Sequence, residues 1–144
     1  MRDIKRIVVH CTGTPPFTPI ANIQKYWREN LGWKNSGYHY IITSNGEVVQ
    51  LADEAAICNG AKGFNYDSIH VAYIGGQTVR KTYGDTRTAE QKTSMFKLLR
   101  SLRIKYGLIP VVGHRDLPNV RKECPCFDAG VWYIEELVKT IPFR

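Results

Sequence analysis

Two histidines stand at the ends of two β-branched, apolar runs in this sequence. His10 closes the run IVVH and His114 directly follows the run VVG. Ligands of open α/β sheets bind beyond the carboxyl ends of the strands, so side chains placed there face a crevice that water and substrate can enter. A single such histidine is most often a hydrogen-bonded structural residue, but two at equivalent strand ends indicate a shared site.

Further ligand candidates lie in KECPCFD, where Cys124 and Cys126 flank Pro125. Two imidazoles and one thiolate are a ligand set typical of zinc, and they leave the fourth tetrahedral position open, as catalytic zinc sites require. The pattern alone permits either cysteine as the ligand, or a redox pair made of both. The separation of the two histidines matches no local zinc signature.

The elements that must position these residues alternate between strand and helix. A hairpin is predicted around Asn45-Gly46, because both residues tolerate positive φ. We expect strands at 4–10, 38–43, 47–51, 68–75 and 109–113, and helices at 19–31, between Thr88 and Gly107, and from Asp128 onward. This order predicts a single α/β domain, residues 1–144, with a central mixed β-sheet of about five strands flanked by helices on both faces.

Cap signals predict where each helix begins. Thr18 before Pro19 predicts an N-cap followed by a proline in the first helical position. Thr88 and Gln91 form a capping-box pattern, and Asp128 is placed to cap the final helix. In that final helix we expect an inward apolar stripe made of Ile134, Leu137, Val138 and Ile141.

Composition narrows the classes of function. The chain carries a net charge of +7 and four cysteines in 144 residues. The positive charge is scattered, so it suits a polyanionic partner without indicating a nucleic-acid module, and none is expected. No apolar run approaches the roughly 18 residues of a membrane span, and the N-terminus lacks a signal-peptide pattern. We therefore expect synthesis in the cytoplasm, no membrane insertion and free thiols.

Five stretches carry a resemblance to a known family: IVVHCTGT, LGWKNSGYHYIITSNGEV, AKGFNYDSIHVAYIGG, VVGHRD and KECPCFD. Together the sequence is similar to zinc amidases of the phage-lysozyme type, N-acetylmuramoyl-L-alanine amidases whose fold is shared with peptidoglycan recognition proteins. The resemblance implies a hydrolase that cleaves the amide bond between N-acetylmuramic acid and L-alanine in peptidoglycan. It implies a phage or prophage lysin that acts on the cell wall after release.

The same resemblance assigns roles to single residues. His10, His114 and Cys124 match the family's ligands of one Zn²⁺ per chain. Tyr38, in the motif G-Y-H, matches a catalytic tyrosine, and Lys122 matches a catalytic lysine. Both could donate hydrogen bonds to the negative oxygen of a tetrahedral intermediate.

Three further positions extend this expected site. The loop before Cys124 is slightly longer than in the family, so Arg121 is an alternative to Lys122 for the catalytic lysine position. Lys62 is expected to meet a carboxylate of the stem peptide, and Trp33 to stack on sugar or peptide.

Strand alternation predicts the orientation of the neighbouring residues. If Tyr38 faces the site, His39 should face away from it as a core histidine. Cys11 should point opposite to His10 as a small buried thiol. His70 lies within a strand and is interpreted as a structural residue.

Other functions remain open to the sequence. One alternative is a non-catalytic peptidoglycan-binding recognition module on the same fold. Another is binding of an RNA polymerase, known for some phage relatives through their N-terminal region, which is not expected because little precedes the first strand. We expect a monomer whose partner is bacterial peptidoglycan.

Overall fold

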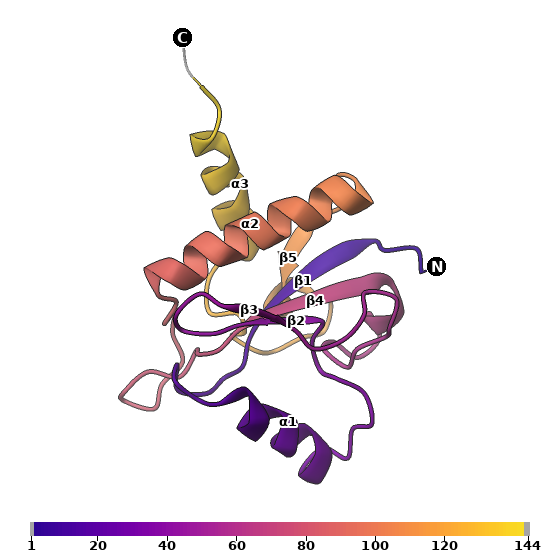
Figure 1. Ribbon diagram of the computed structural model, residues 1–144, viewed down its shortest axis with the longest axis vertical. Coiled ribbons are helices and arrows are strands. Elements are labelled where there is room, and N and C mark those ends of the chain that lie inside the picture. The colour runs from indigo at the N-terminus through magenta and orange to yellow at the C-terminus, as the bar shows by residue number, and fades with distance from the viewer. Residues whose placement is uncertain (1, 143–144) are drawn as a thin grey trace.

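The computed structural model describes residues 2–142, which fold around one five-stranded sheet (Figure 1). The sheet order is β3-β2-β4-β1-β5. β1 runs parallel to both β4 and β5, β2 runs parallel to β4, and only β3 is antiparallel to its neighbour. The strands are β1 (Arg6–Cys11), β2 (Tyr40–Ile42), β3 (Val48–Gln50), β4 (Ser68–Tyr73) and β5 (Val111–Gly113). The mixed sheet expected from the sequence is confirmed.

Helices cover both faces of this sheet, as Figure 1 shows. On one face lies α1 (Ile20–Glu29), whose buried Ile23 and Trp27 pack on the sheet. On the other lie α2 (Ala89–Tyr106) and α3 (Ala129–Lys139), which share an apolar core with the strands. This arrangement confirms the α/β class.

The central strands are buried on both faces, and this explains their unbroken apolar runs. Ile7 and Val9 of β1 belong to the core beneath α2 and α3, whereas Val8 between them packs with Ala61 and Leu117 on the opposite side. Alternation along β1 therefore places His10 on the side away from α2.

Two of the three predicted helix caps are confirmed. Thr88 and Gln91 form the capping box of α2, and the Asp128 side chain accepts a hydrogen bond from the Val131 N–H at the start of α3. The prediction for α1 is wrong: its N-cap is Pro19, without a side-chain hydrogen bond. The Thr18 hydroxyl instead donates to the Pro15 carbonyl at 2.8 Å, which closes the turn before the helix.

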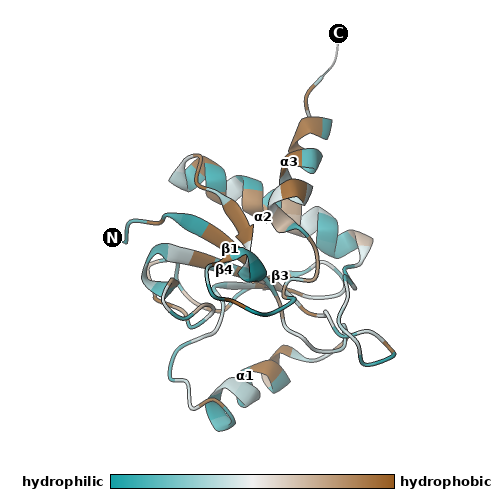
Figure 2. Cartoon of the chain, turned by 180° about the vertical axis from the view of Figure 1, so that it is seen from behind, coloured by the Kyte–Doolittle hydropathy of each residue, from teal (hydrophilic) through white to brown (hydrophobic). Residues whose placement is uncertain are grey.

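The predicted inward stripe of α3 is also wrong for three of its four members. Ile134, Val138 and Ile141 are 50%, 45% and 53% exposed, and only Leu137 packs partly against the core. Ala129 and Tyr133 are buried instead, since only the first half of α3 lies over the sheet (Figure 1). Apolar residues continue along α3 beyond the sheet (Figure 2). Among residues 2–142, none of the helices has the length and apolar character that crossing a membrane requires.

Candidate metal centre and active site

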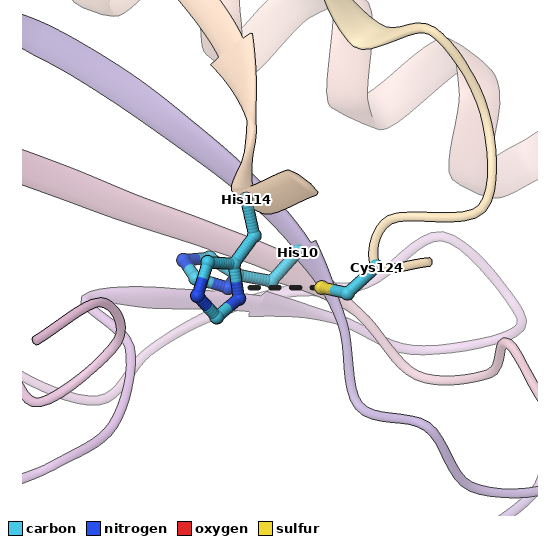
Figure 3. A group of neighbouring side chains, drawn as sticks. All are labelled: His10, His114 and Cys124. Carbon is cyan, nitrogen blue, oxygen red and sulfur yellow. Dashed lines mark hydrogen bonds between the residues drawn. The ribbon is translucent and has the colours of Figure 1, made fainter. Parts of the chain in front are cut away.

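His10, His114 and Cys124 come together at the carboxyl edge of the sheet (Figure 3). His10 lies near the end of β1, and His114 directly follows β5, the parallel neighbour of β1. Cys124 belongs to the loop between β5 and α3. One ligand atom from each of the three residues lies within 4.8 Å of the others, and the distance from Cys124 Sγ to His10 Nδ1 is 3.8 Å.

This geometry fits a tetrahedral metal ion. Zinc bonds of about 2.0 Å to nitrogen and 2.3 Å to sulfur place a nitrogen and a sulfur ligand about 3.5 Å apart at the tetrahedral angle. Both imidazoles are also available as neutral ligands. Burial lowers the pKa of His10 well below its usual value and lowers the pKa of His114 to about 4, and the positive charge of Lys122 adds to both shifts.

The loop that carries Cys124 is held to the sheet by backbone contacts. The Cys11 N–H donates to the Cys124 sulfur at 3.2 Å, and the Arg115 N–H donates to the Cys124 carbonyl at 2.8 Å. Pro125 packs so closely on Gly113 that an added Cβ there would lie 2.7 Å from Pro125 Cδ. A short, glycine-containing β5 therefore lets the loop approach both histidines.

Cys126 does not join this group. Its sulfur lies 3.9 Å from the sulfur of Cys11, which is buried in the apolar core as predicted. All four cysteines are free thiols, as expected, and no bond joins Cys124 to Cys126. Burial raises the pKa of the Cys126 thiol to about 12, so this sulfur is protonated at neutral pH.

Tyr38 lies beside the ligand group. Its ring centroid is 4.9 Å from that of His10, and its hydroxyl donates to the Cys11 carbonyl at 3.4 Å. The Tyr38 ring also packs edge-on against Trp27 of α1, with 5.3 Å between the ring centroids, and this contact helps to hold it in place. Burial, together with Cys124, raises the pKa of Tyr38 well above its usual value. The phenol therefore remains a hydrogen-bond donor at neutral pH.

The predicted orientation of His39 is wrong, although His39 is buried as expected. Its ring stacks on that of His70 at 5.9 Å, on the same side of the sheet as His10. Strict alternation fails here because β2 begins at Tyr40, so Tyr38 and His39 precede the regular strand.

Lys122 is exposed on the loop before Cys124, and its charge acts on both histidine ligands. Arg121 is exposed as well but is not among the charges that shift either histidine. The effect of the Lys122 charge on the pKa of both histidines favours Lys122 over Arg121 for contact with a group bound there.

The two predicted groove residues lie outside the ligand group. Lys62 is exposed in the loop that precedes β4. Trp33 is half-buried and packs against Trp27 of α1, with ring centroids 6.1 Å apart. The structure places neither of them against the three ligand candidates.

Sequence reasoning missed one pair of neighbours of the site. His70 of β4 is fully buried, and its Nδ1 lies 2.8 Å from Nε2 of His10, while its Nε2 lies 2.9 Å from Oδ1 of Asn65. Burial lowers the pKa of His70 to about 3, which keeps the ring neutral. The contact follows from the pairing of β1 with β4, in which His10 lies opposite Ala72, two residues along β4 from His70. One sequence alone does not show which strands pair, so this contact could not be predicted.

Comparison with known proteins agrees with this geometry. The family described as N-acetylmuramoyl-L-alanine amidase matches residues 1–127. The endolysin of Escherichia phage T7 is 35% identical over 128 residues, which cover 88% of this chain and 83% of the endolysin.

Solved structures share the fold over nearly the whole chain. The Ph2119 endolysin of a Thermus scotoductus bacteriophage has a TM-score of 0.79 at 23% identity, covering 94% of this chain and 86% of its own. N-acetylmuramoyl-L-alanine amidase LysC of Clostridium intestinale has a TM-score of 0.73 at 27% identity, covering 96% of this chain and 87% of its own. The chain belongs to the N-acetylmuramoyl-L-alanine amidase family.

Proposed function

We propose that this amidase works through one Zn²⁺ held by His10, His114 and Cys124, and that residues 1–144 form one catalytic domain. Its reaction is hydrolysis of the amide bond between N-acetylmuramic acid and L-alanine in peptidoglycan. The observation that carries the metal proposal is the convergence of two neutral imidazoles and one cysteine, within 4.8 Å of one another, at the edge of a parallel sheet. Three protein ligands leave one position open, as in catalytic zinc sites.

Zinc in this position would polarise the carbonyl under attack and lower the pKa of a coordinated water toward about 7. The chain's own residues hold the ligands in the required state. Burial keeps His10 and His114 neutral, and the Cys11 N–H donates to the Cys124 sulfur, which holds this sulfur beside the two rings.

Two side chains supply hydrogen bonds to the oxygen that becomes negative in the transition state. Tyr38, 4.9 Å from the His10 ring, keeps its proton and therefore acts as a donor rather than a general base. Lys122 adds a positive charge whose field reaches both histidines and lowers their pKa. Preorganised donors of this kind contribute roughly 3 to 4 kcal/mol each.

The remaining proposals concern the substrate and the setting. Lys62 would meet a carboxylate of the stem peptide and Trp33 would contact sugar or peptide as the polymer extends from the metal centre. The net charge of +7 suits an anionic wall polymer. The similarity to phage endolysins supports an enzyme that acts on the cell wall. The lysin would be made in the cytoplasm, reach the wall after release and act as a monomer.

The test is hydrolysis of purified cell-wall sacculi by the full chain, with and without a chelator. We expect glycan strands with free muramic acid lactyl groups and peptides that begin with L-alanine, only when zinc is present. Cys124→Ser should lose both zinc and activity, while the matched control Cys126→Ser keeps both. The reverse pattern would move the ligand to Cys126, and glycan fragments with intact stem peptides would overturn the amidase assignment.

A recognition module that binds peptidoglycan without cutting it is the second reading of the same fold. It is not favoured, because Tyr38 and Lys122 accompany a complete set of three metal-ligand candidates in this chain. Binding to sacculi without release of peptides in the presence of zinc would support it.

A further inference from the structure

A chain of buried hydrogen bonds leads from the loop before β4 to His10. His70 and His10 are 0% and 1% exposed, and the proposed reaction uses His70 in no step. The contacts run from the Ala61 N–H to Asn65 Oδ1 at 2.8 Å, from Asn65 Oδ1 to His70 Nε2 at 2.9 Å, and from His70 Nδ1 to His10 Nε2 at 2.8 Å.

The proton positions in this chain follow from its first member. A backbone N–H can only donate, so the atom of Asn65 that faces the Ala61 N–H must be the carbonyl oxygen. The same oxygen faces His70 Nε2, so this nitrogen donates a proton to it. The His70 ring is fully buried and neither of its hydrogen-bond partners is acidic, so the ring is neutral and carries only this proton. His70 Nδ1 is then an acceptor, so His10 Nε2 carries a proton and donates it into the contact.

We propose that His70, anchored by Asn65, is a positioning residue that fixes His10 in the tautomer with Nδ1 free for the metal. Nδ1 is the nitrogen that faces the Cys124 sulfur at 3.8 Å. The proposal rests on the proposed metal centre. Metal-binding histidines usually donate their second ring N–H to a neighbouring acceptor, which fixes the orientation and the tautomer of the ring.

The surrounding structure is shaped around the His70 ring. At Gly60, an added Cβ would lie 2.4 Å from His70 Nδ1, so the loop can pass the ring only because this residue is glycine. From the other side, the backbone N–H of His70 donates to His39 Nδ1 at 2.9 Å, and the two rings stack at 5.9 Å with an interplanar angle of 9°. The stacking and the close Gly60 backbone pack the His70 ring on its neighbours while its Nδ1 faces His10.

Two substitutions of His70 distinguish the loss of the hydrogen-bond acceptor from a change in side-chain volume. His70→Asn keeps an acceptor oxygen where Nδ1 lies, whereas His70→Leu fills similar space but leaves the His10 Nε2–H without a partner. We expect the zinc affinity of His70→Leu, measured by competition with a chromogenic chelator, to fall 10- to 100-fold, and that of His70→Asn to stay within about threefold of wild type.

Val71→Ala is the matched control for a general loss of stability. Val71 is the next residue of β4, is fully buried, and points into the opposite core. This variant should lower resistance to urea and leave zinc affinity unchanged. Equal zinc affinity in wild type and His70→Leu, or an equal loss in Val71→Ala, would overturn the positioning role.

A second measurement does not depend on the metal. In the metal-free protein, ¹⁵N spectra of the imidazoles should show His10 protonated at Nε2 and bare at Nδ1, and His70→Leu should lose this single tautomer. A wild-type His10 protonated at Nδ1 would overturn the proposal. Failure of the wild type to bind zinc would instead overturn the metal centre, while the tautomer result would still decide the role of His70.

Discussion

The two faces of the sheet differ sharply although the same strands build both. Toward α2 and α3, β1 and β4 present apolar side chains that close into one core, among them Ile7, Val9, Ile69 and Val71. Toward α1, the intervening positions include His10 and His70, joined at 2.8 Å. Since side chains alternate along a strand, a single strand can stabilise the fold on one face and hold chemical groups on the other.

The difference shows how buried polar groups are accommodated in so small a protein. A buried polar atom is costly unless it has a hydrogen-bond partner, and the rings of His39 and His70 are bonded at both nitrogens. The His10 ring differs from them, because its Nε2 contacts His70 and its Nδ1 contacts the sulfur of Cys124, another metal-ligand candidate. We therefore expect substitutions on the two faces to separate catalysis from stability.

We expect the largest effect on activity from a substitution on the face of the sheet that carries His10 and His70, beside the proposed metal centre. Lys122→Ala should lower kcat about 10²- to 10³-fold on sacculi, because it removes a charge placed to stabilise the transition state. Zinc content, measured by atomic absorption, should be unchanged, since Lys122 is not a ligand candidate.

Arg121→Ala is the matched control for this position, because it removes the same charge from the neighbouring residue. It should retain nearly full activity, since Arg121 is not among the charges that act on His10 or His114. A larger loss in Arg121→Ala than in Lys122→Ala would assign the catalytic position to Arg121.

On the apolar face, Leu99→Ala should have the converse effect. Leu99 of α2 is fully buried in the core, and truncation of a buried leucine costs about 2 to 5 kcal/mol. Urea unfolding should show this loss, while the folded fraction keeps its zinc affinity and kcat. A change in zinc affinity would show that the two faces are coupled.

Acid should act mainly through the histidine face. His70 has a pKa of about 3 when folded against about 6.5 when unfolded. Between these values only the unfolded chain binds the proton, so the free energy of unfolding of the metal-free protein should fall as pH decreases. The loss is about 1.4 kcal/mol per pH unit for each such histidine, or roughly 2.7 kcal/mol from His70 at pH 4.5.

Urea titrations at pH 7 and pH 4.5 measure this loss. His70→Asn carries no titrating group at the position and should show a shallower slope by about one proton. None of the four histidines belongs to the apolar core, so Leu99→Ala should keep the wild-type slope. Equal slopes in wild type and His70→Asn would contradict the assignment of the acid sensitivity to this ring.

The sequence predicted the elements well where signals are local. The capping box at Thr88 and Gln91 and the glycine stop at Gly107 bracket α2 as expected, because both depend on contacts within a few residues. The apolar stripe of α3 was mispredicted because the part of a helix that is buried depends on where the sheet beneath it ends. No periodicity within α3 reports that Tyr133, rather than Ile134, faces inward.

The candidate site followed the same rule. Strand ends made His10 and His114 plausible partners, and their convergence with Cys124 agrees with that expectation. His70 was read as structural because its contact with His10 depends on which strand lies beside β1. The need for glycine at position 60 likewise became clear only from the structure, which places the His70 ring beside it.

The smallest expected effect concerns the polar contacts at the start of α2, on the apolar face. The Thr88 hydroxyl accepts from the Gln91 N–H at 3.0 Å and donates to the Ser44 carbonyl at 2.7 Å, so Thr88→Ala should cost about 1 kcal/mol of unfolding free energy. Thr93→Ala, in the same helix and exposed, should be neutral or slightly stabilising because alanine favours the helix. If Thr88→Ala also lowered kcat, the cap would have to transmit its effect through Gln91, whose side chain donates to carbonyls of both Ile42 and Ile74 at 3.1 Å. If Thr88→Ala lowers stability and leaves kcat unchanged, this polar contact serves to stabilise the fold and not catalysis.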